Sequence, residues 1–414
     1  MSATPPPTPT TDVTTTAARV LPAWADADGA ARVTELFRAT FGAEPDGVWA
    51  APGRVNLIGE HVDYNGGLCL PMALPRRTFV AMRRRDDDRI RLVSALHPDD
   101  VWAGAVTDLA PGTVRGFIAY AGGPVWALRQ DGFALGGFDM ADASCVPSGA
   151  GLSSSAAIES AVAVALDATY GLGLADDDAG RARLAAACVR AENEVAGAPT
   201  GGMDQAAALR SEAGHALLLD TIDSSVRLVP FDLAAAGLSL LVIDTRAKHS
   251  LVDGQYAARR EACHDAAQRL GVGTLREVTD LDAALAALPD PVEQMRVRHV
   301  VTEIERVRQF AALVEAGRVR EVGPLLDASH ESLRVDYEVS CAELDVAVAA
   351  ARAAGALGAR MTGGGFGGSA IALVEAGHED DVARAVGAAF AEHGFGAPAF
   401  LIAIASGPAG PISD

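Results

Sequence analysis

The spacing of apolar residues divides the chain into helical and extended segments. Apolar positions three and four residues apart predict a helix over 30–41 that ends at Gly42. Short β-like runs at 48–51, 78–83 and 89–95 predict strands. We therefore expect a first helix, followed by strands of a sheet.

The middle of the chain joins strands to helices through two irregular loops. A strand predicted at 137–144 leads into the loop 147–155, which opens a helix rich in Ala, Val and Leu. Further along, the pattern predicts a helix over 178–194, a loop over 197–202 and strands at 216–220 and 238–244. A strand, a glycine loop and a helix in succession are typical of phosphate-binding proteins.

Beyond about residue 231 the pattern changes to long helices and a few strands. It predicts helices over 250–270, 292–316, 343–354 and 379–393, a glycine run over 363–368, and strands at 369–374 and 400–404. This order indicates an α+β layer, with helices on one side of a sheet. We predict a disordered tail over 1–20 and two domains, 21–230 and 231–414.

Composition excludes several classes of protein. The formal net charge of −20 repels a nucleic acid backbone, and the longest basic run is only Arg83–Arg85. The most apolar helix candidate, over 156–168, is interrupted by Glu159 and falls short of the ~18 apolar residues of a membrane span. We expect a soluble protein whose partners are neither nucleic acid nor membrane.

Cysteine and histidine usage points to the cytoplasm. The 5 cysteines form no close pair and the 9 histidines are dispersed, which fits neither a disulfide framework nor a zinc site. The N-terminal stretch MSATPPPTPTTDVTTT has neither a basic region nor an apolar core, so it does not resemble a secretory signal.

The loop PSGAGLSSSAAIES, which begins at Pro147, is the most informative motif. Its glycines allow backbone amides to face an anion, and the following helix adds its positive N-terminal end. Taken alone, an ordinary serine-capped helix is an equally good interpretation. A Walker-type NTPase is disfavoured because no GxxxxGK followed by Ser or Thr occurs.

Three further features gather chemistry in the same chain. The stretch GRVNLIGEHVDYNGG at 53–67 crowds charged residues between glycines, and MTGGGFGGSA at 361–370 is a third glycine loop. Glu192 and Asp204 flank the loop 197–202 and offer carboxylates for magnesium ligation or proton transfer, although either could be a solvated acid. Together these groups meet the needs of phosphoryl transfer.

With these three loops, the chain resembles the galactokinases of the GHMP small-molecule kinase superfamily, from about Val48 to the C-terminal strand. The first glycine-rich stretch is similar to the galactokinase signature, GAGLSSSAA to the ATP loop and MTGGGFGG to the third motif. HSLVDGQYAARREAC and SHESLRVDYEVSCAELD also resemble galactokinases. The fold implied is α+β, with an N-terminal domain like domain 2 of ribosomal protein S5, a ferredoxin-like C-terminal domain and the active site between them.

The resemblance implies a role for each matched position. Asp204 corresponds to the catalytic aspartate and Arg54 to the arginine beside it. The sugar-binding positions are Glu60, His61, Val62, Asp63, Gly201 and Tyr256. The ATP-binding positions are Ser94, Gly149, Ala150, Gly151, Leu152, Ser153, Ser154 and Ser155.

The implied reaction transfers the γ-phosphate of ATP to the anomeric hydroxyl of α-D-galactose, with Ser155 and Glu192 as ligands of Mg²⁺. We expect a monomer whose partners are galactose and ATP. Two alternatives remain open: a non-catalytic regulatory protein that binds galactose and ATP, and a kinase for a related sugar such as N-acetylgalactosamine or arabinose. The unbroken run Ser154–Ala157 favours an enzyme, because the regulatory members compared lack the dipeptide that follows the serines.

Departures from the family pattern are small. Pro147-Ser148 replaces the usual proline-leucine, and Ala198–Gly201 stands where relatives often have a cysteine before the glycine. Val62 occupies a position where threonine is frequent, which could alter sugar packing. None of these changes removes a reacting group.

Overall fold

The computed structural model describes residues 20–247 and 252–412, and its largest element is a six-stranded sheet. The strands pair antiparallel except for one parallel pair, between β4 and β6. In spatial order they are β13 (Gly410–Pro411), β1 (Gly47–Asn56), β3 (Pro71–Arg84), β6 (Phe138–Ser144), β4 (Arg89–Ser94) and β5 (His97–Ala105).

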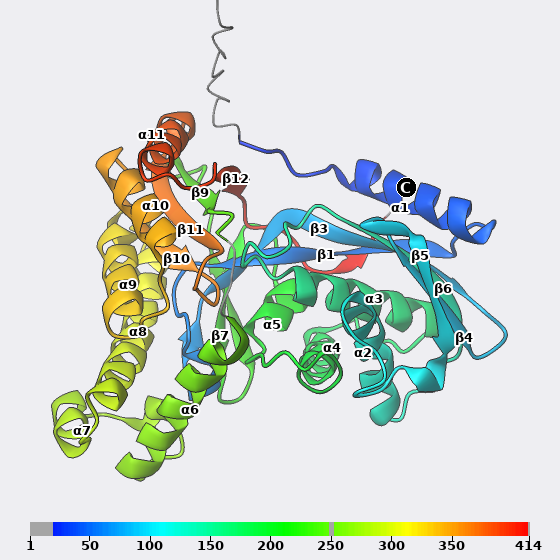
Figure 1. Cartoon of the computed structure of the whole chain (residues 1–414), viewed down its shortest axis with the longest axis horizontal. Coiled ribbons are helices and arrows are strands. Elements are labelled where there is room, and N and C mark those ends of the chain that lie inside the picture. Colours follow the sequence, from blue (N-terminus) through cyan, green and yellow to red (C-terminus); the bar gives the residue numbers. More distant parts are fainter. Residues whose placement is uncertain (1–19, 248–251, 413–414) are drawn as a thin grey trace, which may run out of the picture.

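Helices cover both faces of this sheet (Figure 1). α1 (Asp26–Phe41) packs on one face, where Gly29 lies so close to the Phe79 ring that a Cβ would come within 2.3 Å of it. A second apolar core fills the other face. The helices there are α2 (Phe117–Gln130), α3 (Ser154–Tyr170), α4 (Asp178–Ala191) and α5 (Met203–Arg210).

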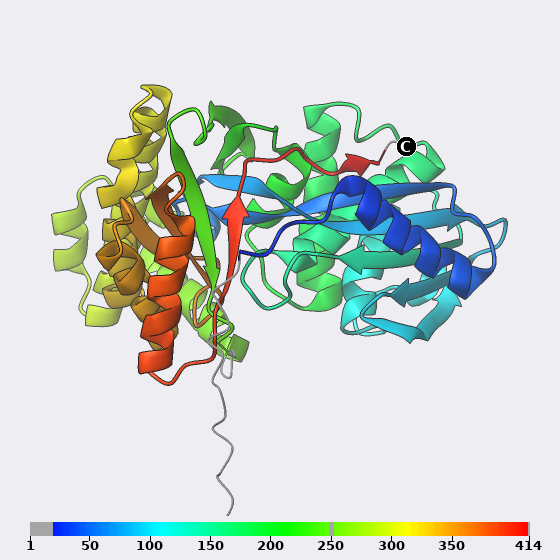
Figure 2. The same cartoon turned by 90° about the horizontal axis from the view of Figure 1, so that it is seen from above.

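The C-terminal half contains a four-stranded antiparallel sheet. Its order is β10 (Gly358–Thr362), β11 (Ser369–Glu375), β9 (Leu238–Asp244) and β12 (Ala399–Ala403). The sequence predicted helices on one side of this sheet, and Figure 2 shows them on the side away from the six-stranded sheet. They are α8 (Pro291–Glu315), α9 (Gly323–Val335), α10 (Ala342–Ala353) and α11 (Glu379–Glu392).

Smaller elements connect the two halves. A three-stranded sheet is formed by β2 (Leu68–Cys69), β7 (His215–Asp220) and β8 (Ser225–Pro230). α6 (Val252–Leu270) and α7 (Leu281–Ala287) pack on α8. Short 3₁₀ turns are formed by Asp63–Asn65, Val106–Asp108, Leu275–Glu277 and Val319–Val322. None of the helices in the described ranges is long and apolar enough to span a membrane.

Both ends of the described chain cross between the halves. Near the N-terminus, the Leu21 N–H donates to the carbonyl of Phe400 at 2.8 Å. At the C-terminus, β13 pairs with β1 through Trp49 and Pro411. The division near residue 230 stays a prediction, and these crossings show that the two halves are linked by more than the chain at that point.

Most predicted elements are present, with ends that shift by a few residues. The helix predicted over 178–194 stops at Ala191 and continues as a π-helical turn, Glu192–Ala196, and the start predicted for α6, at 250–251, lies outside the described residues. The pattern missed β2, β5, β8, β10, β13, α2, α5, α7 and α9. α2 contains two glycines and Pro124, which lower helix propensity, and its packing against α3 and α4 outweighs that cost.

Candidate active site

The glycine loop before α3 is held against β1. A bulge in β1 lies between Pro52 and Arg54, and the Arg54 N–H donates to the Leu152 carbonyl at 3.1 Å. A Cβ on Gly53 would come within 2.6 Å of that same oxygen, so only glycine allows this approach. The bulge therefore places the Arg54 side chain beside the loop.

Arg54 and Asp204 form a bidentate ion pair. Arg54 Nε donates to Asp204 Oδ1 and Arg54 Nη2 to Oδ2, both at 2.8 Å, while Nη1 donates to the Gly151 carbonyl at 2.7 Å. The Ser153 hydroxyl also donates to Asp204. Asp204 lies in the first turn of α5, and its side chain is 21% exposed, whereas Arg54 is buried. The carboxylate is thus fixed from one side and open on another.

Ser153 has an unusual role at the start of α3. Its φ of 59° lies in the left-handed region, and its side chain bonds to Asp204 instead of capping a backbone N–H of the helix. The first N–H groups of α3 are therefore not capped by this residue. A helix start of this kind suits a phosphate.

Glu192 and Ser155 lie together behind this pair. Glu192 is buried, lines the same cavity as Asp204, and accepts hydrogen bonds from the hydroxyl of Ser155 and the amide of Gln205. Burial raises the pKa of Glu192 to about 7, and the Asp204 carboxylate adds to this shift. A hydroxyl and a carboxylate are hard oxygen donors, so these residues fit Mg²⁺.

Glu60 is held by both halves of the molecule. Its carboxylate accepts hydrogen bonds from the Gly363 N–H at 2.6 Å, from the Thr362 hydroxyl at 3.1 Å, and from the Asn56 amide. The buried Arg360 guanidinium lies 3.7 Å away. Burial raises the pKa of Glu60 to about 7, although Arg360 opposes the shift. Glu60 therefore joins the stretch 53–67 to the third glycine loop.

His61 continues this link through a directed chain of hydrogen bonds. Its Nε2 lies 3.1 Å from the Gly364 carbonyl, which can only accept, so Nε2 carries the proton. Its Nδ1 therefore accepts from the Tyr64 hydroxyl at 2.8 Å, and that hydroxyl lies 3.0 Å from the Tyr337 hydroxyl. Burial lowers the pKa of His61 to about 3, so the ring is neutral. Its φ of 60° is the kind of backbone strain found at functional sites.

The remaining predicted sugar-binding residues differ in their placement. Asp63 and Tyr256 line the cavity, and the Tyr256 ring lies 5.4 Å from that of His61. Gly201 packs against Asp63, since a Cβ there would be 2.1 Å from Oδ2. Val62 is fully buried and packs on Gly67, so its side chain supports the segment from behind. Burial raises the pKa of Asp63 to about 6, and Asp204 adds to the shift.

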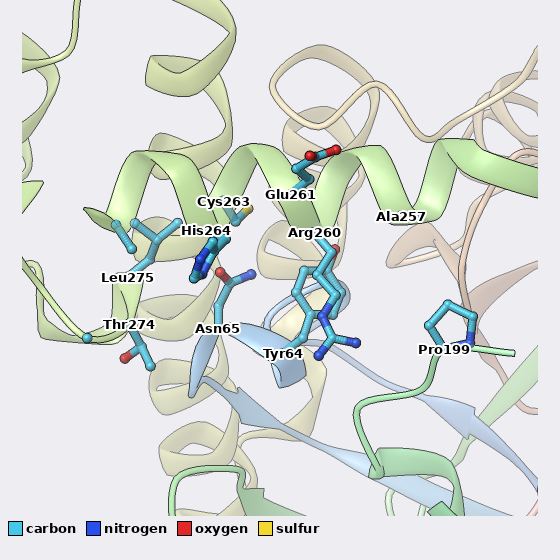
Figure 3. A pocket seen from close by; sticks show the side chains of 12 residues that line it. Tyr64, Asn65, Pro199, Ala257, Arg260, Glu261, Cys263, His264, Thr274 and Leu275 are labelled. Carbon is cyan, nitrogen blue, oxygen red and sulfur yellow. The ribbon is translucent and has the colours of Figure 1, made fainter. Parts of the chain in front are cut away.

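These groups line a polar cavity of about 150 Å³ between the two halves of the chain. The lining residues are Arg54, Glu60, His61, Asp63, Glu192, Pro199, Thr200, Met203, Asp204, Tyr256, Gly363 and Gly364. A second cavity of about 450 Å³ lies beneath α6, and Figure 3 shows Arg260 on this helix and Pro199 on a separate loop among its lining residues. Pro199 lines both cavities, so it forms part of the wall between them.

The predicted ATP-binding residues are only partly brought together. In the loop from Gly149 to Ser155, the side chains of Ala150 and Leu152 are buried in the core, which leaves their backbones for binding. Ser94 is buried at the end of β4 beside Asp142, and it does not line the polar cavity. Its contact with the nucleotide stays a prediction.

Several residues of the site were missed in the sequence, although the quoted motifs contained them. Tyr64 lies within the stretch 53–67, and Tyr337 lies within SHESLRVDYEVSCAELD. Thr362 belongs to the third glycine loop. Only Arg360 stands just outside a motif, and no local pattern indicates that it is fully buried beside Glu60.

Three family descriptions match the chain. The galactokinase galactose-binding signature matches residues 35–84, the GHMP kinases N terminal domain matches 119–212, and the GHMP kinases C terminal matches 310–392. A galactokinase of Streptomyces coelicolor is 55% identical over 380 residues, which are 91% of this chain and 97% of that protein. The chain belongs to the galactokinase family. The resemblance inferred from the motifs is confirmed.

Other relatives agree with this assignment. A galactokinase of Mycobacterium bovis is 47% identical over 352 residues, covering 85% of this kinase and 95% of the relative. The structure of Lactococcus lactis galactokinase complexed with galactose matches with a TM-score of 0.87 and 31% identity over 92% of this chain and 99% of that one. Methanococcus jannaschii mevalonate kinase, at 16% identity and a TM-score of 0.58, shares the fold. The predicted two-domain GHMP kinase fold is confirmed, whereas the likeness of each domain to a ribosomal or ferredoxin fold stays a prediction.

Proposed function

We propose that this kinase transfers the γ-phosphate of ATP to the anomeric hydroxyl of α-D-galactose, giving galactose 1-phosphate and ADP. The observation that carries the proposal is the Arg54–Asp204 pair, which lies between a phosphate-binding loop and a polar cavity. Polar and charged groups of the stretch 60–63 line that cavity, and they suit a ligand with many hydroxyls.

Asp204 acts on the proton of the attacking hydroxyl. Two of its hydrogen-bond donors, Arg54 and Ser153, orient the carboxylate, which accepts the hydroxyl proton or holds it in position as the phosphoryl group moves. Arg54 donates to the same carboxylate and stabilises the negative charge that grows on the phosphoryl oxygens. The bidentate geometry limits reorganisation during the reaction.

Glu60, Asp63 and Tyr256 are the proposed sugar contacts, and His61 orients them. Glu60 and Asp63 present carboxylate oxygens to hydroxyl groups, while Gly201 offers its backbone beside Asp63. His61 is neutral and already bonded on both ring nitrogens, so it fixes the geometry of the segment. The residues that would hold Mg²⁺ are Ser155 and Glu192, and the ion would neutralise the charge of the ATP phosphates.

We further propose that the kinase works as a monomer in the cytoplasm. All five cysteines are free, and three of them are buried, which suits a reducing compartment. The acidic surface, with a formal charge of −20, disfavours nucleic acid as a partner.

Product analysis tests the proposal against its alternatives. Purified protein is incubated with magnesium-ATP and galactose, glucose, N-acetylgalactosamine or arabinose, and ADP is measured. The phosphate is then located by its NMR coupling to the anomeric proton. We expect galactose to give the highest rate and a phosphate on C1. Galactose binding without turnover would favour a regulatory protein, and a higher rate with another sugar would favour a related kinase.

A further inference from the structure

Glu159 is an acidic side chain in an apolar setting. It lies in the second turn of α3, between Ile158 and Ser160, and is 0% exposed. Carboxylates are almost never fully buried without partners, because the charged form loses its hydration. In the sequence this residue was only an interruption of an apolar run, so its burial needs an explanation.

The side chain of Gln205 connects Glu159 to the active site. Gln205 is also 0% exposed, and its Nε2 donates to Glu159 Oε2 at 3.2 Å. The same nitrogen donates to Glu192 Oε2. Gln205 directly follows Asp204 in the first turn of α5. One amide group therefore bridges a buried carboxyl to the proposed magnesium ligand, next to the proposed catalytic aspartate.

Two oxygen atoms of this network have no hydrogen-bond partner: Glu159 Oε1 and Gln205 Oε1. A buried oxygen without a partner is unfavourable, because it has lost its hydrogen bonds to water and gained none in return. A proton on Glu159 Oε1 would satisfy both atoms at once by donating to Gln205 Oε1, because Gln205 Nε2 already donates to the other carboxyl oxygen. A carboxylic acid and a primary amide have complementary donor and acceptor groups for such a cyclic pair.

The surroundings of Glu159 favour this neutral form. Burial raises the pKa of Glu159 well above its usual value, and the carboxylate of Glu192 adds to the shift. An ionised Glu159 would place another negative charge near Glu192 and Asp204, where Arg54 is the cation paired with a carboxylate.

We propose that Glu159 is a positioning residue, which acts through the Gln205 amide to hold the Glu192 carboxylate beside Ser155. The uncharged acid–amide pair fixes the plane of the amide, so its second N–H points at Glu192. It also anchors the start of α5, which carries Asp204. This inference rests on the proposed function in one respect, the role of Glu192 in holding the cation.

The test compares Glu159→Gln with Glu159→Leu. Glutamine keeps a donor and an acceptor and can form an amide–amide pair, whereas leucine is similar in size but has neither group. Binding of Mn²⁺ is measured by EPR with a non-hydrolysable ATP analogue present, together with galactose binding by calorimetry. Glu159→Leu is expected to weaken Mn²⁺ binding about tenfold with little change in galactose affinity. Glu159→Gln is expected to bind Mn²⁺ within about threefold of the parent chain.

Two further variants keep the test decisive. Gln205→Met removes the bridging amide from the other end and is expected to weaken Mn²⁺ binding about as much as Glu159→Leu. It therefore tests the proposal even if Glu159→Leu fails to fold. Ser160→Ala changes a fully buried polar side chain on the same helix and is the matched control, with Mn²⁺ binding expected to be unchanged.

The outcomes separate this inference from the proposed function. Unchanged Mn²⁺ binding in folded Glu159→Leu or Gln205→Met would overturn the positioning role. Equal losses of Mn²⁺ affinity in Glu159→Gln and Glu159→Leu would show that the charged carboxylate is needed, and would overturn the neutral acid–amide pair. Absence of galactose-dependent ADP formation in the parent chain would instead count against the proposed function, because the metal titration does not require turnover.

Discussion

At the scale of single residues, the site depends on a few buried polar contacts. Arg54 and Asp204 are 150 positions apart, and only the family resemblance placed them together before the structure did. The same resemblance assigned Ser153 to ATP, whereas its hydroxyl donates to Asp204. Hydroxyl orientation depends on backbone geometry, here a φ of 59°, which three consecutive serines do not reveal.

Replacing Arg54 by lysine tests the bidentate pair. Lysine keeps the charge but cannot donate two parallel hydrogen bonds, so we expect kcat to fall about 100-fold. Arg91→Lys is the matched control, because Arg91 makes a similar pair with Asp139 at 2.6 and 2.7 Å and does not line the polar cavity. Steady-state ADP release measures both variants. Equal effects in the two variants would contradict a catalytic role for Arg54.

Asp142 gives a prediction about stability and pH. Burial raises the pKa of Asp142 from 3.8 to about 7. Because the folded-state pKa is the higher one, the protonated carboxyl contributes fully to stability below about pH 4, and this contribution is lost as the pH rises to about 7. The loss is at most about 1.4 kcal/mol per pH unit. In urea denaturation, Asp142→Asn is therefore expected to gain stability relative to the parent chain from pH 4 to 7, with no further gain above. If the unfolding free energies of the two proteins change with pH in parallel, the raised pKa of Asp142 is contradicted.

At the scale of elements, loops and helix starts determine the site. The strand-loop-helix order around 137–170 was predictable because periodicity changes sharply there. The π-helical turn Glu192–Ala196 was not, because an extra residue in one turn leaves the spacing of apolar residues nearly unchanged. This turn begins at Glu192 and ends at Ala196, so it directly precedes the loop that carries Gly201.

Gly201→Ala tests the contact between that loop and Asp63. The added Cβ would lie 2.1 Å from Asp63 Oδ2, so the loop or the carboxylate must move. We expect the KM for galactose to rise at least about tenfold while the KM for ATP changes little. Gly396→Ala is the control, because a Cβ there has no atom within 4 Å. Equal kinetics in the two variants would show that this contact does not shape the sugar site.

At the scale of the whole molecule, the two halves of the chain build one cavity. Glu60 and His61 from the first half are bonded to Thr362, Gly363 and Gly364 from the second. The sequence predicted a site between two domains but could not predict which groups meet there, since such contacts span about 300 residues. Nor did it predict that the end of the chain returns to the first sheet, because β13 has only two residues.

A variant truncated after Ser406 tests how much the pairing of β13 with β1 stabilises the fold. It loses the pairing of β13 with β1 and the hydrogen bonds from Ala409 N–H to the Ala208 carbonyl and from Ile412 N–H to the Val48 carbonyl. Each net bond contributes about 1 kcal/mol, so we expect Tm to fall by a few degrees in calorimetry. The galactose dissociation constant is expected to stay within about threefold, because these contacts lie outside the polar cavity. An unchanged Tm would show that the C-terminal strand does not stabilise the fold.

The most direct measurement compares ADP formation by the parent chain and by Asp204→Asn, with galactose binding measured on both. The account predicts galactose-dependent ADP formation by the parent chain, and a rate at least about 100-fold lower for the variant, which still binds galactose. Galactose binding by the parent chain without ADP formation, or undiminished turnover by Asp204→Asn, would contradict it.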